Sequence, residues 1–373
     1  MKLDVVTPSM TSHSGGVGVA VNNLYNNHIR GSEILSSVMI HSLDDGGDTI
    51  FNASSLYLSN VTYQGLMPRS IGLSTRLING VLQSDANAVH LHGLWMMTTI
   101  APVLSKMINN KPFVISAHGM LDPWIISRGK LKKFIAMLAY EKLSWSQASF
   151  FHALNTKEAE SIRLVVPKAR IVVAPNGIDV CADDFVSHIA SETIRFLFLG
   201  RFHLKKNLHS LASAICAIDD EVYRKSPFIL DIVGWGDELY EAEIRRIAAA
   251  KPERFNFLGP KFGEEKDAII KQSHCFVLPS FSEGQPVAVL EAMKVGTPVL
   301  INANCNMPEL SALSLTADCG VSVDEIKQAL LWFLTLSDSD RQAIRRTSFD
   351  YVYQHYAWGS VLPLYEQMYK ELV

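Results

Sequence analysis

Residues 282–301 read SEGQPVAVLEAMKVGTPVLI and predict a loop, a helix and a strand in succession. A glycine and a proline indicate the loop, the apolar run 287–295 indicates the helix, and Gly296 ends it. The runs 274–280 and 299–301 are typical of buried strands on either side. The stretch therefore predicts part of an open α/β sheet, and such sheets bind ligands at the carboxyl ends of their strands.

This stretch carries two carboxylates, Glu283 after the first strand and Glu291 on the helix. One carboxylate can accept hydrogen bonds from the hydroxyls of a sugar and the other from a ribose, while amides at the helix start face a phosphate. Spacing alone leaves a second interpretation open. In that interpretation Glu283 is an acid favoured by the helix dipole, and Glu291 is a solvated helix residue.

Length and composition predict a well-packed protein of two domains. The chain has 373 residues, of which 48% are hydrophobic and 19% charged. Its net charge of −3 leaves no basic excess to neutralise phosphates, so nucleic acid is not an expected partner. Strand-like runs alternate with helical runs throughout, which favours parallel sheets.

The cysteines and the apolar runs indicate the compartment. Five scattered cysteines without a C-x-x-C pair predict a reducing environment and no zinc site. The amino terminus lacks the features of a signal peptide, and no apolar run approaches the roughly 20 residues that span a bilayer. We expect a cytoplasmic protein, with peripheral attachment to the inner face of the membrane as the alternative.

A basic turn follows the strand-like run 194–200 in the second half of the chain. Arg201 stands at the strand end, and Lys206 precedes a helix. Such cations can bind a diphosphate, arginine in bidentate fashion and lysine as a point charge. A solvated basic turn is the alternative. Further along, Gly234 and Gly236 flank a tryptophan at the end of the next strand.

The first half of the chain has polar or glycine-rich segments at three strand ends. Gly16 lies in a glycine-rich loop after the first strand, which suits the approach of a phosphate but is not the G-x-G-x-x-G fingerprint. Another strand ends in HLHGLW, and two histidines without a third ligand do not predict a metal site. We expect one of His90 and His92 to face the cleft and the other to pack, with Trp95 lining an acceptor site. A third strand delivers His118 to its carboxyl end.

Residues 128–145 predict an amphipathic helix with a basic start. Two interpretations remain open. The favoured one is a surface helix that packs Phe134, Met137 and Leu138 inward. The other is an interfacial helix that docks on anionic lipid.

The motifs together resemble those of the retaining, nucleotide-sugar-dependent glycosyltransferases of family 4. Glu283 and Glu291 correspond to its E-x7-E signature, and Arg201 and Lys206 to its G-R-x4-K segment. Residues 176–179, NGID, resemble its interdomain crossing, and the HGM segment at His118 resembles its sugar-contacting histidine. The resemblance extends over nearly the whole chain.

This resemblance implies a GT-B fold of the α/β class, with two Rossmann-like domains whose parallel sheets face a central cleft. The expected domains are an acceptor-side domain, a donor-binding domain and a closing helix that packs back on the first domain, with bounds 1–178, 179–350 and 351–373.

The resemblance also implies the roles of the site residues. Arg201 and Lys206 would neutralise the departing diphosphate, Glu283 and His118 would hold the sugar, and Glu291 the ribose. The leaving phosphate would take the acceptor proton, so no metal and no other cofactor are expected. His92 and Trp95 are expected on the acceptor side. The remaining expected donor-binding residues are Gly16, Gly234, Gly236, Leu258, Gly284, Gln285, Pro286 and Val287.

The implied reaction moves a sugar from a UDP- or GDP-linked donor to a hydroxyl of a glycan or lipid-linked glycan, in the assembly of a cell-surface polysaccharide. Two alternatives remain open at this point, a nucleotide-sugar epimerase of the same fold and a binding protein without catalysis. Gln285 departs from the apolar or aromatic residue that many family members have, so the donor sugar cannot be inferred.

Overall fold

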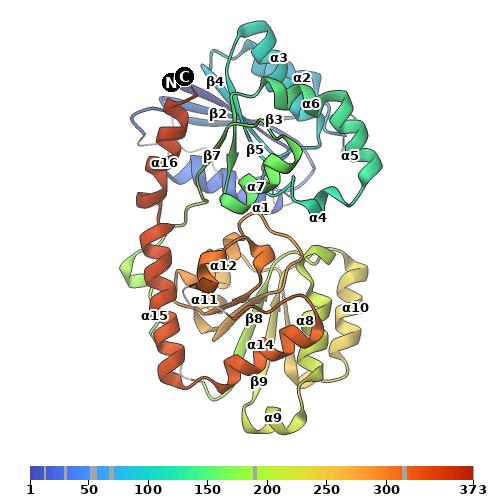
Figure 1. Cartoon of the computed structure of the whole chain (residues 1–373), viewed down its shortest axis with the longest axis vertical. Coiled ribbons are helices and arrows are strands. Elements are labelled where there is room, and N and C mark those ends of the chain that lie inside the picture. Colours follow the sequence, from blue (N-terminus) through green and yellow to red (C-terminus); the bar gives the residue numbers. More distant parts are fainter. Residues whose placement is uncertain are drawn as a thin grey trace. The chain divides into compact units, whose positions relative to one another are not determined.

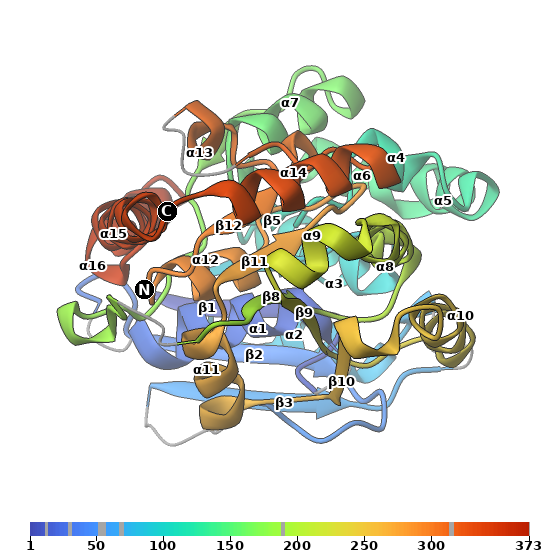
Figure 2. The same ribbon diagram turned by 90° about the horizontal axis from the view of Figure 1, so that it is seen from below.

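The computed structural model of the protein describes residues 1–11, 14–28, 32–50, 57–66, 71–187, 191–312 and 317–372. The chain forms two compact units. Unit 1 consists of Met1–Gly177 and Trp358–Val373, and unit 2 of Ile178–Ala357. In each unit, helices cover a parallel sheet (Figures 1 and 2).

The described part of unit 1 contains a seven-stranded parallel sheet in the order β3-β2-β1-β4-β5-β6-β7. Its strands are β1 (Lys2–Thr7), β2 (Ser37–Leu43), β3 (Leu58–Tyr63), β4 (Ala88–His92), β5 (Phe113–Ser116), β6 (Phe150–Ala153) and β7 (Ile171–Val173). The chain goes outward from β1 to β3 and then resumes at β4 on the other side of β1. The sheet order therefore reverses between β1 and β4.

Helices cover both faces of this sheet, because alternate strand residues point to opposite faces and both sets are buried. Leu3 and Val5 pack on one face, against α1, η1 and α16, and Val6 packs on the other. The helical segments of unit 1 are α1 (Gly15–Asn22), η1 (Asn23–His28), α2 (Thr75–Gln83), η4 (Met97–Thr99), α3 (Ile100–Asn109), α4 (Pro123–Ile126), α5 (Lys130–Ala136), η5 (Met137–Glu141), α6 (Lys142–Gln147), α7 (Thr156–Val165) and α16 (Trp358–Lys370).

The closing helix begins later than the sequence predicts. Residue 351 lies inside α15 (Asp338–His355), and a new helix, α16, begins at Trp358. The helix is interrupted because the carbonyl of Tyr356 accepts a hydrogen bond from the Ile178 amide (2.8 Å) and Ala357 forms a β-bridge with Ile178. Trp358 then packs on Gly177, where an added Cβ would collide with the indole ring. The chain leaves unit 1 and returns to it at this contact.

The described part of unit 2 contains a five-stranded parallel sheet in the order β10-β9-β8-β11-β12. Its strands are β8 (Ile194–Leu199), β9 (Phe228–Val233), β10 (Phe255–Gly259), β11 (Cys275–Leu278) and β12 (Val299–Ile301). The helical segments, besides α15, are η6 (Ala182–Asp184), η7 (Leu204–Lys206), α8 (Leu208–Ala217), α9 (Asp220–Lys225), α10 (Glu238–Ala248), η8 (Pro252–Arg254), α11 (Gly263–Gln272), α12 (Val287–Met293), η9 (Ala303–Cys305), α13 (Pro308–Ala312) and α14 (Val323–Thr335). One continuous apolar core joins this sheet to its helices.

The segment from α5 to α6 differs from the predicted surface helix. Phe134 is 53% and Leu138 56% exposed, so the expectation that they pack inward is wrong, whereas Met137 is half-buried and packs against the core as expected. A π-helical turn, η5, adds a residue to the turn and so shifts the residues after it around the helix axis. The buried side passes instead through Ala136, Glu141 and Trp145.

Within the described ranges, no helix has both the length and the apolar character that crossing a bilayer requires. All five cysteines lie in these ranges, and each is a free thiol.

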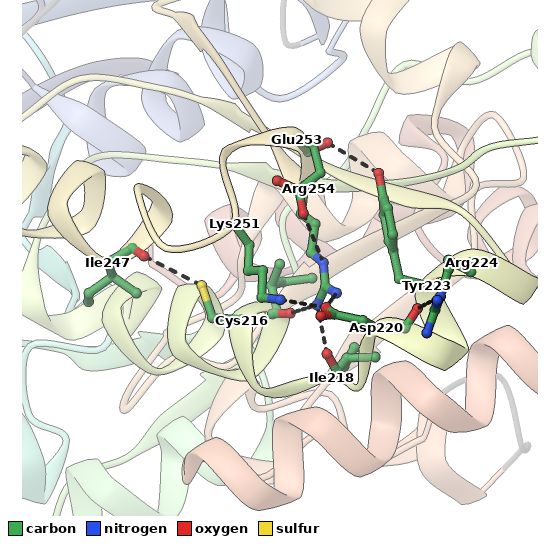
Figure 3. Close-up of polar contacts among 10 residues, drawn as sticks. Cys216, Ile218, Asp220, Tyr223, Arg224, Ile247, Lys251, Glu253 and Arg254 are labelled. Carbon is green, nitrogen blue, oxygen red and sulfur yellow. Dashed lines mark hydrogen bonds and ion pairs between the residues drawn. The ribbon is translucent and has the colours of Figure 1, made fainter.

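Unit 2 depends on one buried arginine that the sequence does not single out. Arg254 is fully buried, and its guanidinium donates to the carbonyl oxygens of Ile215 (3.0 Å) and Ile218 (2.7 Å) at the end of α8. It also pairs with Asp220 (2.6 Å) and stacks on Tyr223 (Figure 3). The side chain therefore supplies donors to carbonyls that the end of a helix leaves unpaired.

The variant Arg254→Ala should lower the free energy of unfolding of unit 2 by about 3–5 kcal/mol, because it leaves two buried carbonyls without their donor and opens a cavity. Urea titration of the full chain measures this loss. Arg246→Ala, which removes an exposed arginine of α10, is the control and should cost less than about 0.5 kcal/mol. Equal losses in the two variants would contradict the structural role of Arg254.

Candidate functional site

The carboxyl ends of β8 and β11 form the centre of the candidate site in unit 2. The chain goes from β8 outward to β9 and β10, and resumes at β11 on the other side of β8. The loops that follow β8 and β11 therefore diverge from one point, which is where open α/β sheets bind ligands.

The loop after β8 presents the predicted cations. Arg201 is exposed, and no acid among the described residues pairs with it. Lys206 ends η7, and Asn207 follows in the left-handed conformation with φ 55°. Asparagine tolerates this conformation, and the Asn207 amide fixes the turn by donating to the carbonyls of Pro279 (3.1 Å) and Val321 (2.8 Å). The asparagine thus holds the basic loop against the end of β11.

Glu283 lies at the end of β11 and binds this loop. Its Oε1 accepts from the ammonium of Lys206 (2.7 Å) and from the hydroxyl of Ser280 (2.7 Å), and Lys205 lies 3.7 Å from Oε2. Burial raises the pKa of Glu283, but the two ammonium groups and the hydrogen bonds outweigh burial, so its pKa lies below the ordinary value. Glu283 is therefore a carboxylate that is held in place before any ligand binds.

Two glycines bring the loop after β9 close to the loop after β8. A Cβ at Gly234 would collide with the carbonyl oxygen of Gly200, and one at Gly236 with the backbone of Phe202. Both positions are therefore restricted to glycine by contact between two loops, which explains the G-W-G spacing physically.

The other predicted donor-binding residues of unit 2 surround these loops. Glu291 lies on α12 and pairs with Lys266 of α11 (2.6 Å). Leu258 lies on β10 and is half-buried, whereas Gln285 is buried. The remaining residues of the loop into α12 are Gly284 and Pro286, both buried, and Val287, half-buried.

In unit 1, two strained residues mark adjacent strand ends. Trp95 follows β4 with φ 71°, and His118 follows β5 with φ 51°. Every other described residue with positive φ is glycine or asparagine, the types that adopt this conformation readily. Strained backbone persists only where surrounding contacts impose it, and it concentrates at functional sites.

The contacts that impose the strain on Trp95 come from the π-helical turn. Glu141 Oε1 accepts from the Trp95 amide (2.5 Å), and the hydroxyl of Tyr140 donates to the Trp95 carbonyl (3.1 Å). The indole N–H donates to the carbonyl of Met120 (3.0 Å). The Trp95 ring is therefore fixed in place, and it remains half-buried.

Glu141 is a residue that sequence reasoning missed. It is fully buried, and its Oε2 has no partner in hydrogen-bond geometry among the described residues, although the nearby Trp145 indole lowers its pKa slightly against the effect of burial. Burial raises the pKa of Glu141 to about 7, against the hydrogen bonds from Trp95 and Thr99. No sequence signal points to it, because in AYEKLSW a glutamate has the position of an ordinary helix-surface residue.

The expected roles of the two histidines on β4 need correction. His90 and His92 are two residues apart on one strand, so their side chains point to the same face. Both are buried, and both ring nitrogens of His92 bond to protein atoms, Nε2 to Tyr25 (3.1 Å) and Nδ1 to His118 (2.9 Å). His92 therefore has no ring nitrogen left for a ligand, and its acceptor-side role stays a prediction, whereas His118, half-buried, forms the outer end of this contact.

The remaining predicted residue, Gly16, lies in the first turn of α1 and is exposed. A Cβ at this position would meet no atom within 4 Å, so packing does not require a glycine there. Gly16, Trp95 and His118 belong to unit 1, and all the other predicted site residues except His92 belong to unit 2. Within the described ranges, no group of three or more His, Cys, Asp or Glu side chains could hold a metal ion.

Comparison with known proteins identifies relatives for both units. Residues 37–181 match the family model described as Glycosyltransferase Family 4, and residues 181–348 match that of Glycosyl transferases group 1. Two relatives are named GDP-mannose:cellobiosyl-diphosphopolyprenol alpha-mannosyltransferase. The one from Xanthomonas campestris is 27% identical over 99% of this chain and 96% of its own length. The one from Xanthomonas oryzae pv. oryzae is 28% identical over 87% of this chain and 86% of its own length.

Solved structures have the same fold. Sucrose-phosphate synthase from Thermosynechococcus elongatus aligns with a TM-score of 0.77 and 16% identity over 100% of this chain and 99% of its own. Anabaena HepE, solved in complex with UDP and glucose, aligns with a TM-score of 0.73 and 15% identity over 100% and 99%. At this identity the likeness establishes the fold and not the substrate.

The raised pKa of Glu141 predicts a pH-dependent stability of unit 1. Between about pH 4.3 and pH 7 the folded state keeps a proton that the unfolded state releases, so stability falls as pH rises through this window. Glu141→Gln mimics the protonated form. Relative to the wild type, this variant should gain on the order of 2–3 kcal/mol in free energy of unfolding between about pH 5 and pH 8. A difference between the two proteins that stays constant with pH would contradict the assignment.

Proposed function

We propose that this chain, which belongs to the glycosyltransferases of family 4 and has the GT-B fold, moves a sugar from a nucleoside-diphosphate sugar to a hydroxyl with retention at the anomeric carbon. The observation that carries the proposal is the basic loop between Arg201 and Lys206, which meets the carboxylate Glu283 where the sheet order of unit 2 reverses. Cations at that edge suit a diphosphate, and a fixed carboxylate suits the hydroxyls of a sugar.

In the proposed mechanism the basic loop stabilises the leaving group. Arg201 is exposed and has no acid partner among the described residues, so its guanidinium can bind the diphosphate in bidentate fashion. Lys206 shares its charge between Glu283 and the departing phosphate. Catalysis is then mainly electrostatic, because positive charge is already in place where negative charge develops. The leaving phosphate takes the acceptor proton, and the two cations supply the charge that a metal would otherwise supply, so we propose that transfer needs no metal.

The other site residues hold the two ends of the donor. Glu283 and His118 position the sugar, and Glu291 accepts from the ribose in exchange for its contact with Lys266. The loops at Gly234 and Gly284, with Leu258, Gln285, Pro286 and Val287, enclose the nucleotide. Gly16, exposed in the first turn of α1, is the residue of unit 1 that we propose to contact the diphosphate.

The substrates are proposed from the named relatives. The Xanthomonas relatives are named for GDP-mannose and a diphosphopolyprenol-linked acceptor, and the Anabaena structure holds UDP and glucose. We therefore propose GDP-mannose or a UDP-hexose as donor and a lipid-linked glycan as acceptor, in the assembly of a cell-surface polysaccharide. Trp95, fixed and half-buried, offers an aromatic face on the acceptor side.

A nucleotide panel with Arg201→Ala tests this proposal. One base, GDP or UDP with its sugar conjugates, should stabilise the wild type by roughly 2.7 kcal/mol at about 100 times its dissociation constant. Arg201→Ala should lose most of that stabilisation and at least about 100-fold in turnover, because it removes a bidentate contact to the leaving group. Thermal shift and product formation from a labelled sugar donor are the measurements.

The control is Arg246→Ala, which removes an exposed arginine of the same unit and should leave both readings unchanged. A chelator should change neither, since the proposed site uses no metal. If no nucleotide stabilises the wild type, the donor-site assignment is wrong. If the nucleotide is bound but the sugar is released without an acceptor or converted to its epimer, the transferase assignment is wrong.

We also propose that unit 1 docks on an anionic membrane surface through α5. Leu131 is 72% exposed, and Phe134, Ile135 and Leu138 are exposed beside it. Basic residues interleave with them, and the one acid of α5 and η5, Glu141, is buried. The helix lies at the side of unit 1 opposite α16 (Figures 1 and 2). An apolar surface with basic residues matches the charge and polarity of an anionic lipid interface.

Vesicle co-sedimentation tests this surface. The wild type should bind phosphatidylglycerol vesicles and not phosphatidylcholine vesicles. The double variant Lys130→Glu/Lys132→Glu should bind at least tenfold more weakly, since each basic residue near the surface contributes about 1 kcal/mol. Leu131→Ser should also weaken binding, whereas Leu239→Ser, at an 84% exposed position of unit 2, should not. Equal binding of all variants would rule out α5 as the docking element.

A further inference from the structure

A line of buried hydrogen bonds crosses unit 1 and ends at His118. It runs over one face of the sheet, the face covered by α1, η1 and α16. We call it the histidine–tyrosine network, and its members are the Ala174 carbonyl, His152, Ser116, His90, Tyr25, Tyr369, His92 and His118.

The direction of the first bonds is fixed by a backbone carbonyl. The carbonyl oxygen of Ala174 can only accept, so His152 Nε2 (2.7 Å) carries the hydrogen. Neutral His152 then accepts at Nδ1, and the hydroxyl of Ser116 must donate to it (2.6 Å). The single hydroxyl hydrogen of Ser116 is thereby used. His90 Nε2 must therefore donate to the Ser116 oxygen (2.6 Å), which leaves His90 Nδ1 as an acceptor.

The middle of the network is a triangle that two tyrosines form with His90. The hydroxyls of Tyr25 and Tyr369 each lie 2.8 Å from His90 Nδ1 and 2.7 Å from one another. Two hydroxyl hydrogens are available for these three contacts. The triangle has the most hydrogen bonds when it keeps both hydrogens. One tyrosine then donates to His90 Nδ1, and the other donates to the oxygen of the first tyrosine.

The hydrogen between Tyr25 and His92 must then come from His92. If Nε2 of His92 donates to the Tyr25 oxygen (3.1 Å), Nδ1 is an acceptor, and His118 Nε2 donates to it (2.9 Å). In the opposite arrangement Tyr25 donates its hydrogen to His92, so only the Tyr369 hydrogen remains for the triangle. Two of the three triangle contacts then have no hydrogen between the two atoms, whereas in the first arrangement only one lacks it. The first arrangement has one more buried hydrogen bond, and unpaired buried polar contacts are unfavourable.

Burial keeps the rings neutral, as this assignment requires. It lowers the pKa of His118 to about 3 and that of His152 to about 4, and it lowers the pKa values of His90 and His92 well below the ordinary value. A neutral histidine carries one ring hydrogen, so fixing one nitrogen fixes the other.

We propose that the histidine–tyrosine network holds His118 as its Nε2–H tautomer, so that Nδ1 accepts a hydrogen bond from a hydroxyl of the bound sugar. The sugar as ligand rests on the proposed function, whereas the tautomer does not. No described residue bonds to Nδ1 of His118. An acceptor at this atom favours a group that has a hydrogen to donate and repels a phosphate or ring oxygen, so it selects a hydroxyl-bearing ligand.

Two variants that each delete one hydroxyl of the triangle separate this proposal from a purely structural role. In Tyr369→Phe, Tyr25 still donates to His90 and accepts from His92, so the tautomer should be kept. In Tyr25→Phe, the hydroxyl of Tyr369 donates to His90, and His92 loses the partner that fixes its Nε2 hydrogen. His118 should then become a mixture of tautomers.

The readout is long-range ¹H–¹⁵N correlation of the histidine rings in the ligand-free full chain, with the His118 signals assigned by their loss in His118→Gln. The wild type and Tyr369→Phe should show His118 protonated at Nε2 only, and Tyr25→Phe should show protonation at Nδ1 as well. A wild type with His118 protonated at Nδ1, or a Tyr25→Phe spectrum identical to that of the wild type, would overturn the proposal. Because no ligand is present, this result is independent of the transferase assignment.

The second measurement is kinetic. The kcat/KM for the sugar donor should fall roughly tenfold in Tyr25→Phe, the effect of one misdirected hydrogen bond, and by less in Tyr369→Phe. If the tautomers behave as expected and the two variants have equal kcat/KM, the tautomer stands and its role in sugar recognition is rejected. If no variant or wild type turns over, the proposed function fails and the tautomer result is unaffected.

Discussion

The ion pair between Lys206 and Glu283 joins the two loops on which the donor site depends. These loops follow β8 and β11, which diverge at the point where the sheet order reverses. A buried carboxylate is unfavourable without a nearby cation, so the contact with Lys206 favours the position of the basic loop against the end of β11. Asn207 secures the same approach by bonding to the carbonyl of Pro279. The charges that would meet a diphosphate are therefore arranged by folding and not by the ligand.

In unit 1 the candidate site residues lie next to buried polar side chains of the sheet, and not next to an ion pair as in unit 2. Three histidines, on β4 and β6, occupy positions where parallel strands normally carry aliphatic residues. Each is satisfied by a neighbour across the strands or by a tyrosine hydroxyl, so the face is polar but hydrogen-bonded. Burying these polar side chains is unfavourable for the folded state, and the strained backbone at Trp95 and His118 is unfavourable as well. Such features persist where a site needs rings held in fixed orientations.

The sequence predicts the features that depend on short spacing. The strand, loop and helix around Glu283, the basic loop at Lys206 and the glycine pair at Gly234 all follow from local rules of backbone conformation and charge. What it does not predict depends on long-range packing. Glu141 ends a π-helical turn and is buried against the Trp95 amide, a contact 46 residues away in the sequence, and Phe134 just before that turn is exposed. Likewise, the direction in which His92 donates depends on Tyr25, which is 67 residues away in the sequence.

The return of the chain at Trp358 has a consequence for the order of folding. Helix α16 fills the apolar core of unit 1, yet it follows the whole of unit 2 in the sequence. On the ribosome, unit 2 has its full sequence as soon as Ala357 emerges, whereas unit 1 lacks one wall of its core until α16 has also emerged. The unit that is translated first is thus the unit that is completed last, and the nascent chain holds an open amino-terminal sheet throughout the synthesis of unit 2.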